Sequence, residues 1–170
     1  TWPQSIGQVP LYYNHKNTGR PLKPGVEFEK FRSNYLDISN EPLYPFGYGL
    51  SYSDFSYSEV KLDKTRAHGN QTVTASVTVT NRVSVDGKEV VQLYLRSMTG
   101  SITRPVKELK GFKKVLVKAG ESTTVSFALT PEDLKFYNSE LKYDWEPGEL
   151  VVMIGGNSRD LKSARLHWDR

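Results

Sequence analysis

Cysteine is absent from the 170 residues, so the chain can build neither a disulfide nor a metal site that relies on thiolate ligands. Long apolar runs are absent too, and none approaches the roughly 20 residues of a membrane-spanning helix. Of the three histidines, His15, His68 and His167, none stands at a metal-ligand spacing such as His-Glu-x-x-His. We therefore expect no metal, no cofactor and no membrane span.

Signatures of catalysis are equally scarce. The chain has no Gly-x-Ser-x-Gly elbow, and Gly47-Tyr48-Gly49 lacks the third glycine and the flanking strand and helix of a dinucleotide site. A glycosidase needs two carboxylates on opposite sides of the bond that it cleaves. Asp37 and Glu41 share one loop, and the acids of residues 144–149 share one turn, so neither group suits that geometry. We predict no catalytic residue in this chain.

The formal net charge is +4, and basic residues are densest between Lys107 and Lys118, a run flanked by Glu108 and Glu121. On a strand these lysines fall on both faces or in turns, whereas nucleic-acid binding requires one basic face with interleaved aromatic rings. Lysines commonly protect the exposed edge of a sheet. We prefer that interpretation and expect no nucleic-acid partner.

Ten tyrosines, thirteen glycines and nine prolines favour strands and turns over helices. The clearest strand covers residues 73–79, where valine and alanine alternate with threonine and serine. Further alternating segments follow as far as Trp168, separated by turn signals such as Asp86-Gly87 and Glu146-Pro147-Gly148. Seven or more short strands predict an all-β fold, an antiparallel sandwich that begins near Ser51.

Two local features refine this prediction. The apolar spacing slips by one residue near Gly111, which predicts a β-bulge. Thr130-Pro131-Glu132-Asp133 combines an N-cap, a proline at the first helical position and acids in the first turn, so it predicts one turn of helix over Leu134.

The first 50 residues have a different character. Val9, Leu11 and Tyr13 alternate, which predicts a short strand, and Pro10 would place it at a sheet edge. Because no partner strand lies nearby, we interpret it as the last strand of a sheet located upstream. Residues 15–42 form a loop of about 28 residues, and loops of this length are generally functional or lie across another surface.

Residues 43–52 connect the two parts. The rings and glycines of this junction are Tyr44, Phe46, Gly47, Tyr48, Gly49 and Tyr52. The glycines permit positive φ or a close backbone approach, and large rings on such a backbone either pack or form an exposed apolar patch. We interpret the segment as a packed domain junction, with an aromatic surface turn as the alternative.

Several stretches are more specific than these patterns. They cover residues 9–15, 18–21, 43–52, 90–94, 104–112, 146–148 and 154–155. The most distinctive are Pro-Phe-Gly-Tyr-Gly-Leu-Ser-Tyr at 45–52 and Arg-Pro-Val-Lys-Glu-Leu-Lys-Gly-Phe at 104–112. Through these motifs the chain resembles, over essentially its whole length, the C-terminal region of glycoside hydrolase family 3, of the bacterial periplasmic β-glucosidase type.

The resemblance implies a division of the chain and a parent enzyme. Residues 1–50 would be the tail of an α/β sandwich domain plus an interdomain linker, and residues 51–170 an immunoglobulin-like, fibronectin-III-like β-sandwich. The parent would hydrolyse terminal β-D-glucosyl residues with retention, without a cofactor, in the periplasm or outside the cell. Its nucleophile and its acid/base would both lie upstream, so the partners of this chain would be the upstream catalytic domains and, through them, a β-glucoside or oligosaccharide substrate.

Two functions remain open for the chain itself. As a docking and stability module, it would approach the parent's substrate pocket through the long loop, and the candidates are His15, Arg20, Tyr35 and Asp37. The alternative is that these four residues only contact the neighbouring domains and do not approach the substrate pocket. As a carbohydrate-binding module, it would stack sugars on an aromatic surface formed by Trp2, Tyr94, Trp145 and Trp168.

Overall fold

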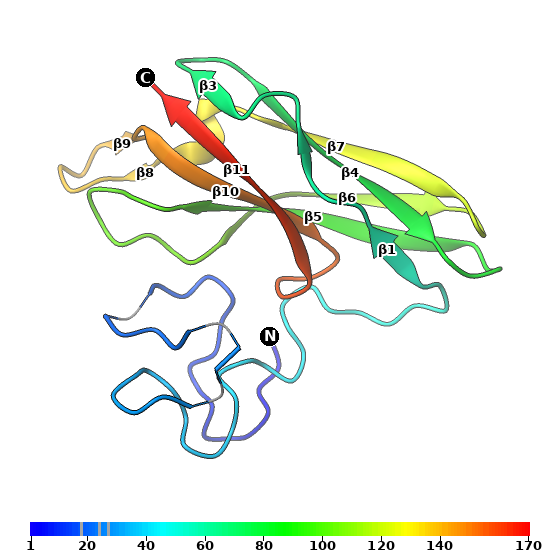
Figure 1. Cartoon of the computed structure of the whole chain (residues 1–170), viewed down its shortest axis with the longest axis horizontal. Helices are drawn as coiled ribbons and strands as arrows, with labels where there is room; N and C mark the ends of the chain where they lie inside the picture. Colours follow the sequence, from blue (N-terminus) through cyan, green and yellow to red (C-terminus); the bar gives the residue numbers. More distant parts are fainter. Residues whose placement is uncertain (18, 24, 27) are drawn as a thin grey trace.

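The computed structural model describes residues 1–17, 19–23, 25–26 and 28–170. Two β-sheets pack face to face, and an irregular N-terminal segment, residues 1–54, lies against one side of them (Figure 1). The all-β sandwich expected from the alternating pattern is confirmed. Among the described residues no helix is long and apolar enough to cross a membrane.

The smaller of the two packed sheets is built around β4 (Val73–Asn81). Strands β1 (Phe55–Tyr57) and β2 (Lys61–Leu62) pair with it in succession, and β7 (Ser122–Leu129) also pairs with it. All these pairings are antiparallel. The alternation over residues 73–79 therefore predicted the central strand of this sheet.

The larger sheet has five strands, and one of its pairings was not predicted. Their order is β3 (Arg66–His68), β11 (Leu161–Asp169), β10 (Gly148–Gly155), β5 (Gly87–Ser97) and β6 (Glu108–Val117). Strand β3 runs parallel to β11, while the other pairings are antiparallel. Three residues are too short to show a periodic pattern, so the sequence did not indicate β3 or its direction.

The core lies between the two sheets. On β4, Val73, Ala75 and Val79 are fully buried and point inward, whereas the threonines and serines between them point outward. Val91 and Leu93 of β5 meet them from the facing sheet. Alternating residues of two inner faces are the usual core of an aligned sandwich.

Both refinements of the fold are confirmed. Leu93 lies opposite Gly111 and Tyr94 lies opposite Leu109, so Lys110 is the extra residue of a bulge between β5 and β6. The helical turn is the 3₁₀ helix η1 (Pro131–Leu134). It precedes a small hairpin of β8 (Phe136–Tyr137) and β9 (Tyr143–Asp144).

The strand predicted over Val9–Tyr13 is not formed within the described part of the chain, and its interpretation as the last strand of an upstream sheet stays a prediction. No segment of the described chain pairs with these residues, which follow an irregular path. A strand needs the hydrogen bonds of a neighbour, and Pro10 has no N–H to offer one. Alternation alone therefore cannot form a strand where no partner edge is present.

Buried hydrogen bonds hold the N-terminal segment together instead. Gln8 is fully buried, and its side-chain amide donates to the carbonyls of Ser39 at 2.8 Å and Glu41 at 2.9 Å. Its side-chain oxygen accepts the Gln4 N–H at 2.7 Å. Because a buried amide is costly without partners, Gln8 ties together parts of the segment that lie more than 30 residues apart in sequence.

Charged groups connect β3 to β11 at the sheet edge. Arg66 donates to Asp169 at 2.7 Å, and the two ring nitrogens of His167 each lie 2.8 Å from a carboxylate, that of Glu149 or that of Asp169. Hydrogen bonding to Glu149 and then to Asp169 raises the pKa of His167. Hydrogen bonding to Arg66 and then to His167 lowers the pKa of the Asp169 carboxyl.

This cluster makes stability dependent on pH. Unfolded histidine titrates near pH 6.5. Because folding raises the pKa of His167, its stabilisation is fully present below pH 6.5 and is lost as the pH rises through the folded pKa. His167→Gln should therefore lower the urea midpoint more at about pH 6 than at about pH 8.5. In His15→Gln, the control, the midpoint should not show this pH-dependent loss, and an equal loss for His167→Gln at both pH values would contradict the prediction.

Candidate functional site

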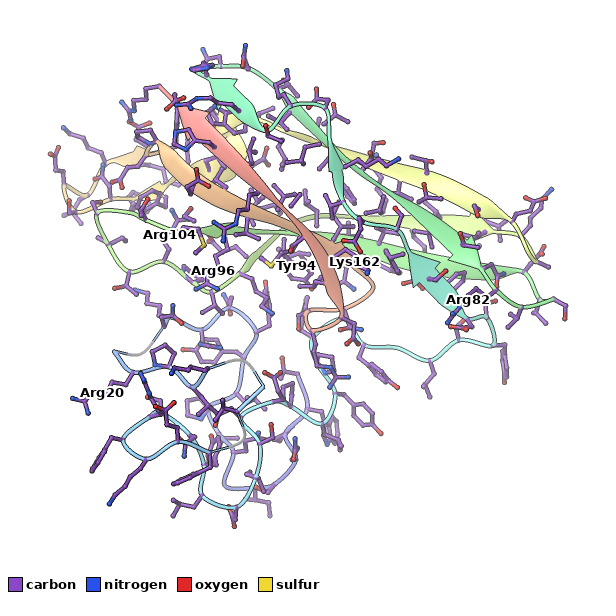
Figure 2. The ribbon with its side chains drawn as sticks, in the orientation of Figure 1. Arg20, Arg82, Tyr94, Arg96, Arg104 and Lys162 are labelled. Atoms are coloured by element: carbon purple, nitrogen blue, oxygen red, sulfur yellow. The ribbon has the colours of Figure 1, made fainter. Side chains whose placement is uncertain are left out.

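The four substrate-proximal candidates all lie on the N-terminal segment. His15, Arg20 and Asp37 are exposed, and Tyr35 is half-buried. Figure 2 shows the Arg20 side chain pointing away from the sandwich. A ring nitrogen of His15 lies 3.0 Å from the carbonyl of Lys16. Within the described part of the chain, no hydrogen bond or ion pair joins any two of the four, so the chain does not assemble them into a site.

The acids of the 144–149 turn have structural partners. Asp144 pairs with Arg170, Glu146 accepts the Ser101 N–H at 2.7 Å, and Glu149 pairs with His167 at 2.8 Å. Each carboxylate is thus held by a different neighbour and none is opposed to another across a cleft. Among the described residues no cluster of histidines and acids could hold a metal ion.

An aromatic stack joins the N-terminal segment to the sandwich. The ring of Phe46 stacks on Tyr13 with centroids 4.5 Å apart, and Tyr13 meets Tyr94 of β5 edge-on at 5.7 Å. The carbonyl of Phe46 accepts the Ser158 N–H at 2.8 Å. Burial, and then the neighbouring Tyr13, raise the pKa of Tyr94, so its hydroxyl stays neutral and donates to Gln92.

A set of polar contacts around Gln92 lies beside this stack. Gln92 of β5 is buried, and its amide donates to the carbonyl of Gly156 at 2.6 Å and, more weakly, to that of Gly47 at 3.5 Å. Gly47 has a φ of +80°, and a Cβ there would lie 2.4 Å from the Gln92 amide. The junction therefore needs glycine at position 47 for its conformation and for space. Nearby, the Lys107 ammonium donates to the Ser158 carbonyl at 2.6 Å.

The other side of the junction is uncovered. Leu50 is 90% and Tyr52 98% exposed, and Trp2, Tyr44 and Tyr48 are also exposed. Tyr44 and Tyr48 stack on each other at 4.9 Å and line a surface hollow together with Trp2, Pro45 and Leu50. Contiguous apolar surface of this kind generally marks a contact site.

The aromatic surface proposed for sugar stacking is not formed by the four predicted rings. Tyr94 and Trp168 are fully buried and Trp145 is 8% exposed, while only Trp2, at 65%, faces solvent. Trp145 and Trp168 meet edge-on in the core. Tyr94 lies under the N-terminal segment, which the strand pattern could not show. The prediction of one platform from these residues is wrong.

Two residues that join the N-terminal segment to the sandwich were not predicted. Tyr13 and Gln92 hold the two parts of the chain together, yet neither was singled out as a docking residue. Gln92 occupies an outward-facing position of a strand, which normally indicates solvent. Two features of the sequence could have indicated that another segment packs on this face. Tyr94 places a large ring on the same face as Gln92, and the glycines at 47 and 156 permit a close backbone approach.

Comparison with known proteins gives this architecture a context. Residues 89–158 match the fibronectin type III-like domain family. The chain is 50% identical over 162 residues to the periplasmic beta-glucosidase of Salmonella typhimurium, covering 95% of this chain and 21% of that protein. It is 41% identical to thermostable beta-glucosidase B of Acetivibrio thermocellus, covering 95% of this chain and 22% of that protein.

A solved structure agrees with these relatives. The crystal structure of beta-glucosidase from Listeria innocua superposes with a TM-score of 0.91 at 46% identity, covering 99% of this chain and 23% of that one. The sandwich is thus a fibronectin type III-like domain. The chain corresponds to the C-terminal region of glycoside hydrolase family 3 β-glucosidases, as its motifs predicted, and spans about a fifth of the length of these relatives.

The close approach of Gly47 to Gln92 can be tested with a matched pair of glycine substitutions. Gly47→Ala forces a side chain into positive φ and against Gln92, so it should lower the free energy of unfolding by about 1–3 kcal/mol. Gly49→Ala has open space and no positive φ, so it should change that free energy by less than about 1 kcal/mol. Urea unfolding of both variants checks this, and equal effects would contradict the proposed geometry at position 47.

Proposed function

We propose that the chain is the non-catalytic C-terminal module of a retaining β-glucosidase, which contributes domain docking and stability. In this proposal residues 1–50 are the tail of the α/β sandwich domain plus the linker, and residues 51–170 are the fibronectin-III-like sandwich. The parent enzyme hydrolyses terminal β-D-glucosyl residues. The names of the relatives from Salmonella typhimurium and Listeria innocua support this activity.

The docking role is supported by a difference between the two sides of the junction, residues 43–52. One side is bound to the sandwich through the carbonyls of Phe46 and Gly47, which accept hydrogen bonds from Ser158 and Gln92. The other side exposes Tyr44, Tyr48 and Leu50. A solvent-exposed cluster of this size disfavours an isolated module, and the upstream domains of the parent would cover it. We accordingly propose that Tyr44, Phe46, Gly47, Tyr48, Gly49 and Tyr52 form the domain junction.

The candidates near the substrate belong to the same proposal. His15, Arg20, Tyr35 and Asp37 lie on the segment that would contact the upstream domains, and three of them are exposed and available for such contacts. The parent would act on a β-glucoside or oligosaccharide without a cofactor. A periplasmic or extracellular location is proposed because the Salmonella relative is named as periplasmic.

The isolated chain should be inactive, because within residues 1–17, 19–23, 25–26 and 28–170 the candidate acids are each held by separate neighbours or lie apart, without an opposed pair. Incubated with p-nitrophenyl β-D-glucoside, it should release no more nitrophenol than a blank, while the longer protein that contains it releases product readily. Removing the chain from the longer protein should lower its thermal unfolding midpoint by several degrees, which calorimetry would measure. Hydrolysis by the isolated chain, or an unchanged midpoint, would refute the proposal.

Carbohydrate binding is the second candidate function, and the exposed Trp2 beside the Tyr44–Tyr48 stack is the observation that favours it. Under the docking proposal, tryptophan fluorescence should stay unchanged when cello-oligosaccharides are added. A saturable change that disappears in Trp2→Phe would instead establish a sugar-binding surface. Trp145→Phe serves as the control, because that ring is buried.

A further inference from the structure

A groove beside the junction combines positive charge with hydroxyl groups. It is lined by Asn17 and Arg96 and by residues 97–106, which include Ser97, Thr99, Ser101 and Thr103. The lining residues contain no acid and no aromatic ring. Figure 2 shows Arg96 on the side of the sandwich that faces the N-terminal segment. The wall is therefore suited to an anion and unsuited to stacking a neutral sugar.

Arg96 is half-buried but has no carboxylate partner among the described residues. By contrast, Arg104 of the same groove is 7% exposed and forms an ion pair with Glu108 at 2.7 Å. Glu146, behind the loop, accepts the Ser101 N–H. The acids next to the groove are thus occupied, and a half-buried guanidinium without a partner is costly.

Neighbouring charges add to the positive potential. Across the sheet, Val151 of β10 lies between Arg96 of β5 and Arg165 of β11, and Arg165 forms no ion pair within the described chain. The pKa of Lys107 is lowered chiefly by burial; the charge of Glu41 opposes this shift and the charge of Arg96 adds to it. Arg96 and Arg104 thus line the groove, while Lys107 and Arg165 lie beyond its lining, and Glu41 is the one acid that shifts the pKa of Lys107.

We propose that the groove at Arg96 binds a carboxylate, supplied by an aspartate or glutamate side chain from the part of the longer protein outside these 170 residues. A guanidinium binds a carboxylate through two parallel hydrogen bonds, and the hydroxyls of the groove can donate further ones. This deepens the docking role proposed above and rests on it. Because the two partners belong to one polypeptide, a contact that is weak between separate molecules is effective there.

The location of the groove supports that source of the carboxylate. The His15 carbonyl accepts the Val106 N–H at 2.9 Å, and Lys16 forms a bridge with Pro105. The N-terminal segment therefore forms one wall of the groove. This is the segment that we assign to the end of the preceding domain, so the groove lies where that domain would meet the sandwich.

The first test titrates the 170-residue chain with N-acetylglutamate at constant ionic strength and follows arginine Nε–H resonances by NMR. The Arg96 resonance should shift saturably, whereas N-acetylglutamine, the neutral control ligand, should cause no saturable shift. Arg96→Gln should weaken binding about tenfold. Arg82→Gln, which removes an exposed partner of Asp54, should leave binding unchanged. Equal shifts at all arginines, or none at Arg96, would overturn the proposal.

The second test identifies the source of the carboxylate. Phenylglyoxal modifies accessible arginines, and mass spectrometry can compare Arg96 and Arg82 in the 170-residue chain and in the longer protein. Arg96 should be protected about tenfold in the longer protein, while Arg82 reacts equally in both. If Arg96 reacts equally in both and N-acetylglutamate protects it in both, the groove takes a free acid and the side-chain source is refuted.

A final comparison separates this proposal from the docking role. Tyrosine nitration of the longer protein reports on Tyr44 and Tyr48, which docking should protect. Protected tyrosines with a reactive Arg96 would refute the carboxylate contact and retain docking. Reactive tyrosines together with a reactive Arg96 would refute both proposals.

Discussion

The arrangement of the chain depends on the contacts that bury two outward-facing residues of β5. Tyr94 and Gln92 face away from the core, where a strand residue ordinarily meets water. Here Tyr13 packs edge-on against Tyr94 and carries Phe46 stacked on its own ring, and the carbonyl of Gly156 accepts a hydrogen bond from the Gln92 amide. The N-terminal segment itself is held by the Phe46 carbonyl, which accepts the Ser158 N–H at 2.8 Å, and by the Gly47 carbonyl, which lies 3.5 Å from the Gln92 amide nitrogen. Because buried polar groups need partners, these contacts give the segment one preferred position on the sandwich.

The consequences extend to both proposed roles. With Phe46 held against the sandwich, Tyr44 and Tyr48 are turned toward the opposite side, where they form the uncovered hollow. The same arrangement makes the N-terminal segment one wall of the groove at Arg96. An apolar hollow and a positively charged groove thus flank one junction. Together they favour a module that is completed by contacts with another part of a longer protein.

Much of the sandwich could be predicted because its signals are local. Alternation located the centre of β4, a slip in spacing located the bulge opposite Leu93, and a capped proline located η1. Val9–Tyr13 alternated equally well but formed no strand, since pairing requires a second edge. The candidates His15 and Arg20 were chosen for their place in a long loop, and loop position alone carries no information about which groups meet.

The sequence by itself determined the class of fold, the inward faces of the long strands and, through its motifs, the family. These depend on periodicity and on short contiguous segments. Only the tertiary structure decided which outward residues are covered and which charges remain unpaired. Gln92 and Arg96 are both polar residues on the same face of β5, yet the first is buried with its partners and the second has no carboxylate partner in the part of the chain that the structure describes. The N-terminal segment, more than 40 residues away in sequence, covers Gln92 but forms only a wall beside Arg96, and this difference in packing decides the fate of the two side chains.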